Sequence, residues 1–171
     1  MLEIHSRFPH RPHSAYGLKI YGRLRLPFDL RQKSRQRAAL ESGEEVAIAL
    51  PRGEVLRGGD LVVASGGEVV EIVAQPEKVL HVECGDAMAL ARVAYHLGNR
   101  HVPVQVGDGW LRFASDHVLE EMVKVLGATV RALDEPFEPE AGAYTAHHRH
   151  DNESGHGGRI HEFHAHDDPA R

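Results

Sequence analysis

The sequence predicts an α+β protein with two domains and a histidine-rich tail. In residues 1–76, short apolar runs alternate with glycine-rich turns and show no helical period, which favours a small all-β domain. In residues 77–137, strand-like runs alternate with two helical stripes. Periodicity stops after residue 137, so we expect residues 138–171 to form a disordered tail.

The amino-acid composition and net charge are those of an ordinary globular protein. Charged residues make up 26% and hydrophobic residues 42% of its 171 positions, and the net charge of −5 gives no general reason to expect a nucleic acid or an anionic membrane as partner. No apolar run approaches the ~20 residues that span a bilayer, and the first residues hold no signal-peptide core, so we expect a cytoplasmic protein. Cys84 is the single cysteine, which excludes an intrachain disulfide and a Cys-x-x-Cys site.

A basic run is the main feature of the first domain. It follows a strand whose apolar residues alternate with polar ones, at Leu18, Ile20, Leu24 and Leu26. Its cations occupy every second position and would line one face of an extended chain; they are Arg31, Lys33, Arg35 and Arg37. The run is either a solvated strand face or a patch for an acidic protein partner. Further short strands and turns lead to Gln75-Pro76, where we place the domain boundary.

The second domain begins with a strand and then a helix over residues 86–97. Its apolar residues recur with the i, i+3, i+4, i+7 spacing of a half-buried helix. Asp86 is suited to cap its first turn, and Gly98 is suited to the left-handed conformation that ends a helix. Residues 101–106 then alternate like a strand, with three valines on one face. This pattern places His101 on the opposite face, away from the core.

The rest of the second domain completes a familiar order of elements. A strand at residues 110–113 precedes a second helix, which begins after Ser115 or Asp116 and ends at Gly127. A last strand covers residues 129–133. The resulting βαββαβ order is typical of the ferredoxin-like fold, in which two helices cover one face of an antiparallel sheet.

Histidine is the outlier of the composition, with 14 residues in the chain. His101 alone holds a divalent metal weakly, but a two-fold axis would place a second copy of it alongside. The tail adds seven histidines spaced among acidic residues, at His147, His148, His150, His156, His161, His164 and His166. Tracts of this kind indicate metal binding, and neutral imidazole suits Ni²⁺, Cu²⁺ and Zn²⁺.

Two other functions fit the residues less well. A hydrolytic metalloenzyme needs three fixed ligands and a general base, and the predicted folded part holds no His-Glu-x-x-His or similar pair. An RNA-binding sheet needs aromatic side chains for base stacking, and the strands offer only Trp110 and Phe113, of which Trp110 is more plausibly core. We therefore expect a binding protein and no enzyme.

Several stretches together resemble the UreE-type urease accessory proteins, a family of nickel metallochaperones. The resemblance covers nearly the whole chain and rests on residues 31–37 (RQKSRQR), 50–53 (LPRG), 95–101 (YHLGNRH), 116–119 (DHVL) and 136–144 (PFEPEAGAY), followed by the histidine tail. It implies a homodimer in which His101 is the metal ligand at the interface. Some members carry a His-x-His pair where this chain has Ser115 and His117, so His117 is a further candidate ligand.

The resemblance also implies a role and partners. The β domain would contact partner protein, and the client would be the urease apoprotein together with other urease accessory proteins, including the GTPase. Two His101 residues would hold Ni²⁺ between subunits, and tail histidines would complete its coordination and release it to the recipient. The alternative is metal storage by the tail, with the folded domains as a dimer scaffold.

Overall fold

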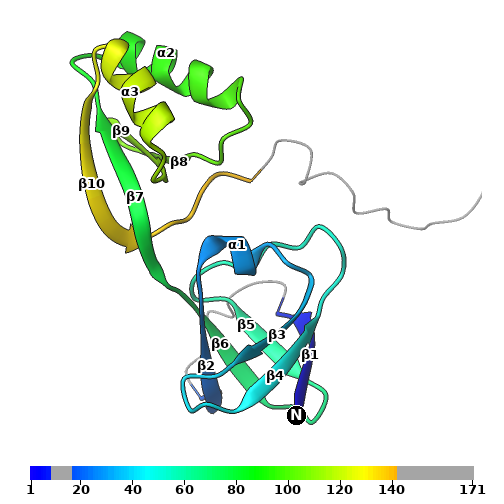
Figure 1. Ribbon diagram of the computed structural model, residues 1–171. Helices are drawn as coiled ribbons and strands as arrows, with labels where there is room; N and C mark the ends of the chain where they lie inside the picture. The colour runs from blue at the N-terminus through cyan, green and yellow to red at the C-terminus, as the bar shows by residue number, and fades with distance from the viewer. Residues whose placement is uncertain (9–16, 142–171) are drawn as a thin grey trace, which may run out of the picture. The chain divides into compact units, whose positions relative to one another are not determined.

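The computed structural model describes residues 1–8 and 17–141 of the chain (Figure 1). The strands in these residues form two sheets, one of six strands and one of four. Of the tail predicted to start at residue 138, the first four residues are described, and their contacts show that the prediction of disorder is wrong for them. Phe137 and Pro139 are buried on either side of Glu138. Residues 142–171, with all seven tail histidines, lie outside the described residues.

The first sheet and one short helix cover the β-rich first part. The elements are β1 (Leu2–Arg7), β2 (Ile20–Leu26), α1 (Phe28–Arg31), β3 (Arg35–Ala39), β4 (Glu45–Ala49), β5 (Leu61–Ala64) and β6 (Val69–Ala74). Their order in the sheet is β2-β6-β5-β1-β4-β3, with β1 parallel to β4 and β2 parallel to β6. The remaining neighbours in this sheet are antiparallel.

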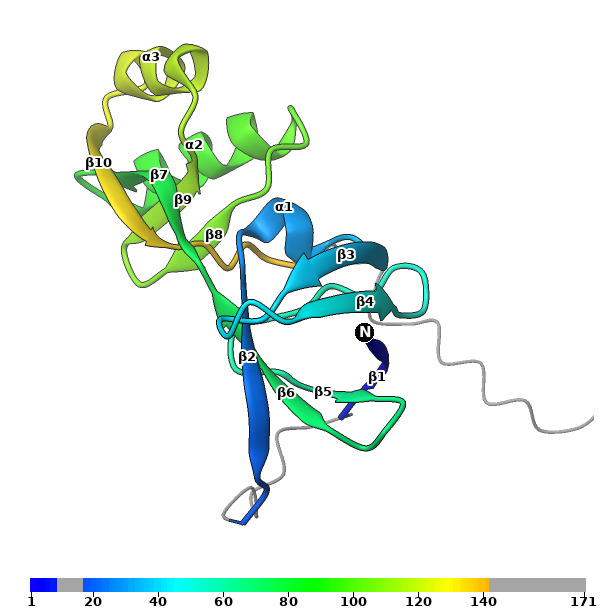
Figure 2. The ribbon, with the colours of Figure 1, turned by 60° about the horizontal axis from the view of Figure 1, so that its bottom comes forward.

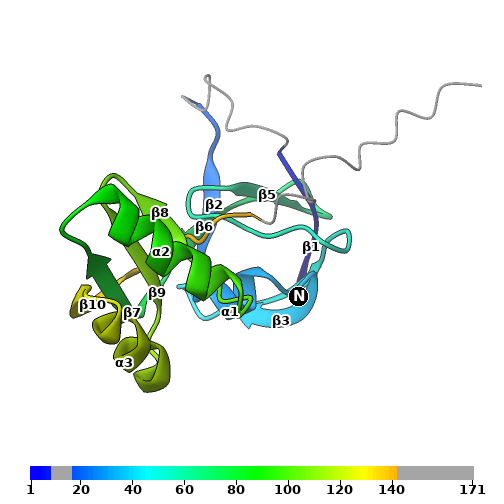
Figure 3. The ribbon, with the colours of Figure 1, turned by 90° about the horizontal axis from the view of Figure 1, so that it is seen from above.

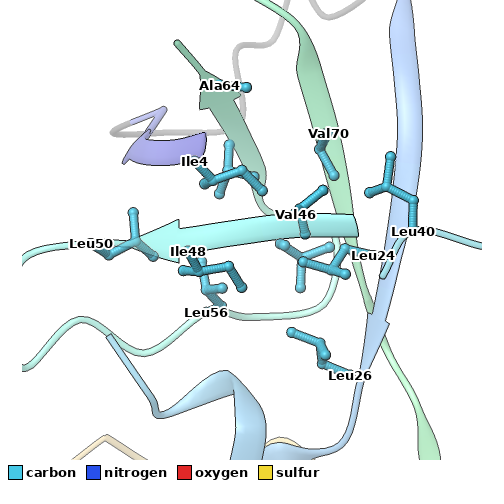
Figure 4. Close-up of a cluster of buried hydrophobic side chains, with 12 residues drawn as sticks. Ile4, Leu24, Leu26, Leu40, Val46, Ile48, Leu50, Leu56, Ala64 and Val70 are labelled. Atoms are coloured by element: carbon cyan, nitrogen blue, oxygen red, sulfur yellow. The ribbon is translucent and has the colours of Figure 1, made fainter. Parts of the chain in front are cut away.

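The first sheet curls around its own core. The backbone N–H of Glu41, just after β3, donates to the carbonyl of Arg23 in β2 at 2.9 Å, which brings the two edge strands together (Figure 2). The curl encloses a cluster of buried aliphatic side chains drawn from every strand region, among them Ile4, Leu24 and Ile48 (Figure 4). Alternation has its predicted effect along β4 and at Leu24 and Leu26 of β2, which line this cluster, whereas it fails at Leu18 and Ile20, which are exposed.

The second sheet carries two helices. Its elements are β7 (Pro76–Glu83), α2 (Ala87–Gly98), β8 (Gln105–Gly107), β9 (Trp110–Ala114), α3 (His117–Val125) and β10 (Thr129–Pro136). The strands are antiparallel neighbours in the order β10-β7-β9-β8. Residues of both helices join one apolar cluster with β7 and β9, and the helices lie on the same side of the sheet (Figures 1 and 3). This element order is the predicted βαββαβ order.

The strand predicted for residues 101–106 is mostly absent. Only β8 pairs with β9, starting at Gln105, and residues 101–104 form a turn and an irregular segment. Val102 and Val104 still pack on the helical side, but Val106 is 54% exposed. The valine alternation therefore did not predict the strand correctly. The backbone hydrogen bonds that end α2 already determine the path of residues 99–102.

A third apolar cluster lies where the chain passes from the first sheet to the second. It contains Phe28 of α1, Val79 of β7 and Phe137, just after β10. The rings of Phe28 and Phe137 meet edge to face with centroids 5.4 Å apart. Within the described part of the chain, no helix is long and apolar enough to cross a membrane.

Candidate metal centre

The helix α2 is a firm support for the residues that follow it. The side chain of Asp86 accepts a hydrogen bond from the N–H of Ala89 at 2.7 Å, as the sequence predicts for an N-cap. Val93 and Leu97 are fully buried against the sheet. The C-terminal end of α2 is therefore fixed by packing, and so is the point from which the next loop leaves.

Residues 98–102, the His101 turn, close α2 with two backbone hydrogen bonds. The N–H of Val102 donates to the carbonyl of Leu97 at 3.2 Å, and the N–H of His101 donates to the carbonyl of Gly98 at 2.9 Å. These are the 6→1 and 5→2 bonds of a Schellman motif, in which the residue before the last one is left-handed. His101 occupies that position, with a φ of +55°, and it is the only non-glycine residue with positive φ in the described chain.

His101 was predicted to begin a strand, but its backbone is left-handed. Gly98, predicted to be left-handed, is the last helical residue, and the left-handed conformation falls three residues later. A side chain with a Cβ is disfavoured there, and such residues concentrate at functional sites. Val102 and Leu97 join the same apolar cluster, which holds the turn in place. The imidazole of His101 is exposed, and the described residues supply no hydrogen bond to it.

His117 is the other candidate ligand within the described residues. It is the first residue of α3 and is exposed. Asp116, one of the two predicted caps, accepts from the N–H groups of Val118 and Leu119 at 2.8 and 3.0 Å. The cap fixes the start of α3 and leaves the His117 side chain in solvent.

One chain does not assemble a metal site from its described residues. No group of three or more histidine, cysteine, aspartate or glutamate side chains is placed there to hold an ion. Cys84 is half-buried beside the core of the second sheet, and burial raises the pKa of its thiol, with Asp86 adding to the effect. Its thiolate is disfavoured, so Cys84 is suited to packing rather than to metal binding.

The basic run divides into a buried and an exposed part. Arg31 ends α1 and is fully buried, so its predicted place on an exposed strand face is wrong. Lys33 lies in the connection that follows, and Arg35 and Arg37 lie on β3; all three are exposed. The extended pattern starts only after the short helix, which the spacing of basic residues gave no means to detect.

Arg31 instead meets a residue that the sequence gave little reason to single out, Glu138. The guanidinium Nη1 of Arg31 donates to Glu138 Oε1 at 2.9 Å. Arg57 donates to the other carboxylate oxygen at 3.2 Å, and the N–H of Gly58 donates to Oε1 at 2.7 Å. A Cβ on Gly58 would lie 3.0 Å from that oxygen, so the approach is close. We call Arg31, Arg57, Gly58 and Glu138 the Glu138 clamp.

A second unpredicted network covers the sheet face opposite the helices. His81 is 7% exposed, and its Nδ1 accepts from Arg112 at 3.2 Å while its Nε2 lies 3.1 Å from Glu83. Arginine can only donate, so Nδ1 is the acceptor in the contact with Arg112 and Nε2 is the nitrogen that faces Glu83. The hydrogen bond from His81 lowers the pKa of the Glu83 carboxyl, outweighing a raising effect of desolvation, and Arg131 contributes in the same direction.

Trp110 belongs to this face and not to the core of the second sheet. Its ring lies 5.2 Å from the His81 ring and 4.5 Å beneath the Arg112 guanidinium, measured between centres. Gly107 lies directly under the indole, where a Cβ would meet the ring at 2.0 Å. Phe113, three residues along β9 and so on the other face of the strand, points to the helices and is fully buried. Alternation along a strand allowed either face, so composition alone assigned Trp110 to the wrong one.

Comparison with known proteins agrees with both halves of this fold. Residues 12–75 match the family model described as UreE urease accessory protein, N-terminal domain, and residues 77–167 match that of the C-terminal domain. The chain belongs to the UreE family of urease accessory proteins. The two family domains meet where β6 ends and β7 begins.

Curated UreE relatives are similar over most of the chain. A urease accessory protein UreE from Ralstonia nicotianae is 50% identical over 90% of this chain and 74% of its own length. The UreE protein of Nitrosospira multiformis is 52% identical over 80% of this chain and 78% of its own. That of Paraburkholderia xenovorans is 51% identical over 83% of this chain, but the match spans only 63% of the relative, less than two thirds of its length.

Proposed function

We propose that this protein is a nickel metallochaperone that delivers Ni²⁺ for assembly of the urease active site, without catalysing a reaction itself. The observation that carries the proposal is His101. A rigid helix end presents its imidazole to solvent in a left-handed conformation that a glycine would adopt more easily. Membership of the urease accessory family supplies the process in which such a ligand is useful.

A single His101 holds Ni²⁺ weakly, so the proposal includes a homodimer. A two-fold axis near the His101 turn would pair two imidazoles from identical patches. The exposed side of α2 supports this arrangement, because Met88 and Tyr95 are 71% and 64% exposed and lie on the helix that ends three residues before His101. Exposed apolar side chains of this size are suited to an interface.

Further ligands would come from His117 and from the tail histidines His147, His148, His150, His156, His161, His164 and His166. Ligands on a tether can leave the metal one at a time, which suits transfer to a recipient. Doubling the length of a tether costs only about 0.6 kcal/mol in closure entropy, so even distant tail histidines remain usable. Cu²⁺ and Zn²⁺ are the expected competitors, since they accept the same imidazole ligands.

The exposed part of the basic run is the proposed contact with partner protein. Lys33, Arg35 and Arg37 are exposed, and β3 is an edge strand of its sheet. Their charge suits acidic surfaces on the urease apoprotein or on another accessory protein, such as the GTPase. Arg31 is excluded from this surface by its burial. We also infer the ferredoxin-like class for residues 77–137 from the strand order β10-β7-β9-β8.

Calorimetric titration with Ni²⁺ tests the metal proposal on the full chain, a chain ending at Tyr144, and the full chain with His101→Ala. The shortened chain should keep one tight site per dimer, and His101→Ala should remove it. His5→Ala is the matched control, since His5 is an exposed histidine on the first sheet. If shortening abolishes all binding while His101→Ala changes nothing, the protein stores metal in its tail.

The partner surface is tested by charge reversal. Arg35→Glu with Arg37→Glu should weaken binding to the urease apoprotein complex at least tenfold. Lys78→Glu with Arg92→Glu is the control, because both side chains are exposed and lie on β7 and α2 of the second domain. Equal weakening by both pairs would mean that only net charge matters and would exclude a specific surface on β3.

A further inference from the structure

We infer that Arg112 binds a carboxylate, and that the face of the second sheet opposite the helices docks an acidic side chain of a partner protein. The site lies wholly on the second sheet and includes none of the proposed metal ligands. It therefore goes beyond the proposed function and does not depend on nickel binding. The observation that carries it is a guanidinium that two neighbours hold in place and that has no carboxylate partner among the described residues.

The place of Arg112 follows from the register of the strands. On β9 it lies directly opposite His81 of β7, and His81 lies opposite Arg131 of β10. Neighbouring strands are about 4.8 Å apart, so the two arginines leave the backbone about 10 Å apart with the histidine between them. The helices pack on the other face of this sheet (Figure 1). Both guanidinium groups therefore belong to the face that the helices leave uncovered.

Two contacts set the orientation of the Arg112 guanidinium. Its Nε donates to His81 Nδ1 at 3.2 Å, and its central carbon lies 4.5 Å from the centre of the Trp110 ring. The ring is itself held close to Gly107, where a Cβ would meet the indole at 2.0 Å. Stacking uses the face of the guanidinium and the histidine uses its Nε, so the direction of the two terminal nitrogens is fixed.

These terminal nitrogens are the unused part of Arg112. The described residues offer no acceptor to either Nη, and none of their carboxylates forms an ion pair with Arg112. Arg131 differs, because it is paired with Glu83 at 2.7 Å. The parallel N–H groups at the end of a guanidinium match the two oxygens of a carboxylate. Because the fork is already oriented, little conformational entropy is lost when such a ligand binds.

The charge of this face selects the kind of ligand. The hydrogen bond from His81 lowers the pKa of Glu83, so this carboxylate is ionised at neutral pH. Two arginines and Glu83 then give the face one net positive charge, which a single carboxylate balances and a phosphate dianion would exceed. The side chains of Arg131 and Glu83 are 60% and 46% exposed, so the face is open to a partner. One exposed ion pair binds weakly, and we therefore assign the carboxylate to a protein whose other contacts add affinity.

Trp110 reports on the site, because it is the only tryptophan of the chain. The full chain is titrated with acetyl-Glu-Ala-Glu-amide and, as the matched neutral probe, with acetyl-Gln-Ala-Gln-amide, while NMR follows the indole N–H signal. The acidic peptide should shift this signal saturably and the neutral peptide should not. Arg112→Gln should raise the midpoint of the titration about fivefold. Arg112→Lys keeps the charge without the fork and should recover only part of this loss. Unaltered binding by either variant would overturn the inference.

The support from His81 is tested separately from stability. His81→Phe removes the acceptor of the Arg112 Nε–H, which should exchange faster with water in the NMR spectrum. Peptide binding should weaken less than in Arg112→Gln. Thermal unfolding of each variant shows whether the fold is intact at the temperature of the titration. Faster Nε–H exchange with unchanged peptide binding would show that His81 does not position Arg112 for a ligand.

Two further titrations identify the source of the carboxylate and the surface involved. Sodium acetate should bind more weakly than the acidic peptide, and an equal midpoint would mean a site for free small anions and would exclude docking of a protein. Arg35→Gln with Arg37→Gln, on the partner surface proposed for β3, should leave the Trp110 titration unchanged. Failure of that surface is thus distinguishable from failure of this site, since only Arg112 variants affect the indole titration if the inference is right.

Discussion

Arg31 and His101 are both polar side chains placed by the end of a helix, and the fold treats them in opposite ways. Arg31 is fully buried and donates to four acceptors of its own chain. His101 is exposed, left-handed and without a side-chain hydrogen bond from the described residues. Arg31 therefore uses its hydrogen bonds to stabilise the fold. His101 keeps its imidazole free for a ligand, and its left-handed backbone lowers local stability. In this chain, burial and hydrogen bonding distinguish a structural polar side chain from a candidate ligand more clearly than residue type does.

The largest expected effect concerns the buried side of this comparison. Arg31→Met should lower the free energy of unfolding by about 3–5 kcal/mol, because it breaks the ion pair of a fully buried guanidinium with Glu138 and removes the four hydrogen bonds that Arg31 donates. Arg35→Met, an exposed position on β3, should change it by less than about 0.5 kcal/mol. Urea unfolding followed by circular dichroism measures both. A loss below about 1 kcal/mol for Arg31→Met would show that the clamp contributes little to the fold.

The same pair of residues shows how far the sequence could lead. Periodicity found both helices of the second domain, the cap at Asp86, and Asp116 as one of two candidate caps, because amphipathic spacing and capping are local properties. It could not separate Arg31 from Arg35, since burial of an arginine depends on Glu138, 107 residues away along the chain. A regular spacing of charges says nothing about such long-range partners.

The candidate site divides in a similar way. His101 was singled out by the alternation of residues 101–106 and by the family resemblance of residues 95–101, but its left-handed conformation could not be read from the sequence. Gly98 was the better candidate by residue type, and the hydrogen bond from Val102 back to Leu97 shifted the left-handed position to the histidine. The network of His81, Glu83 and Arg112 was missed because Arg112 reaches the two β7 residues from a different strand, β9.

A smaller effect tests whether the support of the His101 turn is as firm as the packing indicates. Asp86→Ala removes the oxygen that accepts from the N–H of Ala89 and should destabilise the protein by about 1 kcal/mol. Asp116→Ala, which uncaps α3 and its two N–H groups, should lower stability by a similar amount. Thermal unfolding measures both. If Asp86→Ala also weakens Ni²⁺ binding and Asp116→Ala does not, α2 is the element that positions the metal ligand.

A substitution at His101 itself should have the opposite sign. His101→Gly relieves a side chain at φ +55° and should raise the free energy of unfolding by about 0.5–1 kcal/mol while removing the proposed metal ligand. Arg100→Gly is the control, since Arg100 has negative φ and gains nothing from glycine. Chemical unfolding in the absence of metal measures the difference. If His101→Gly is instead less stable, the imidazole makes favourable contacts within the chain and is not free to bind a metal.

The smallest effect concerns Glu83, which is neither buried like Arg31 nor uncommitted like His101. The hydrogen bond from His81, with Arg131 adding to it, lowers the pKa of Glu83 in the folded state, so folding favours the ionised carboxyl. Its contribution is complete above the unfolded-state pKa of about 4.3 and is lost as the pH falls through the lower folded-state pKa. Unfolding of the unaltered protein and of Glu83→Gln, compared between pH 6 and pH 3, should therefore show a stability difference that shrinks towards pH 3. A difference that stays constant across this range would mean that Glu83 is held by packing and not by its charge, which would place it with neither of the two residues compared above.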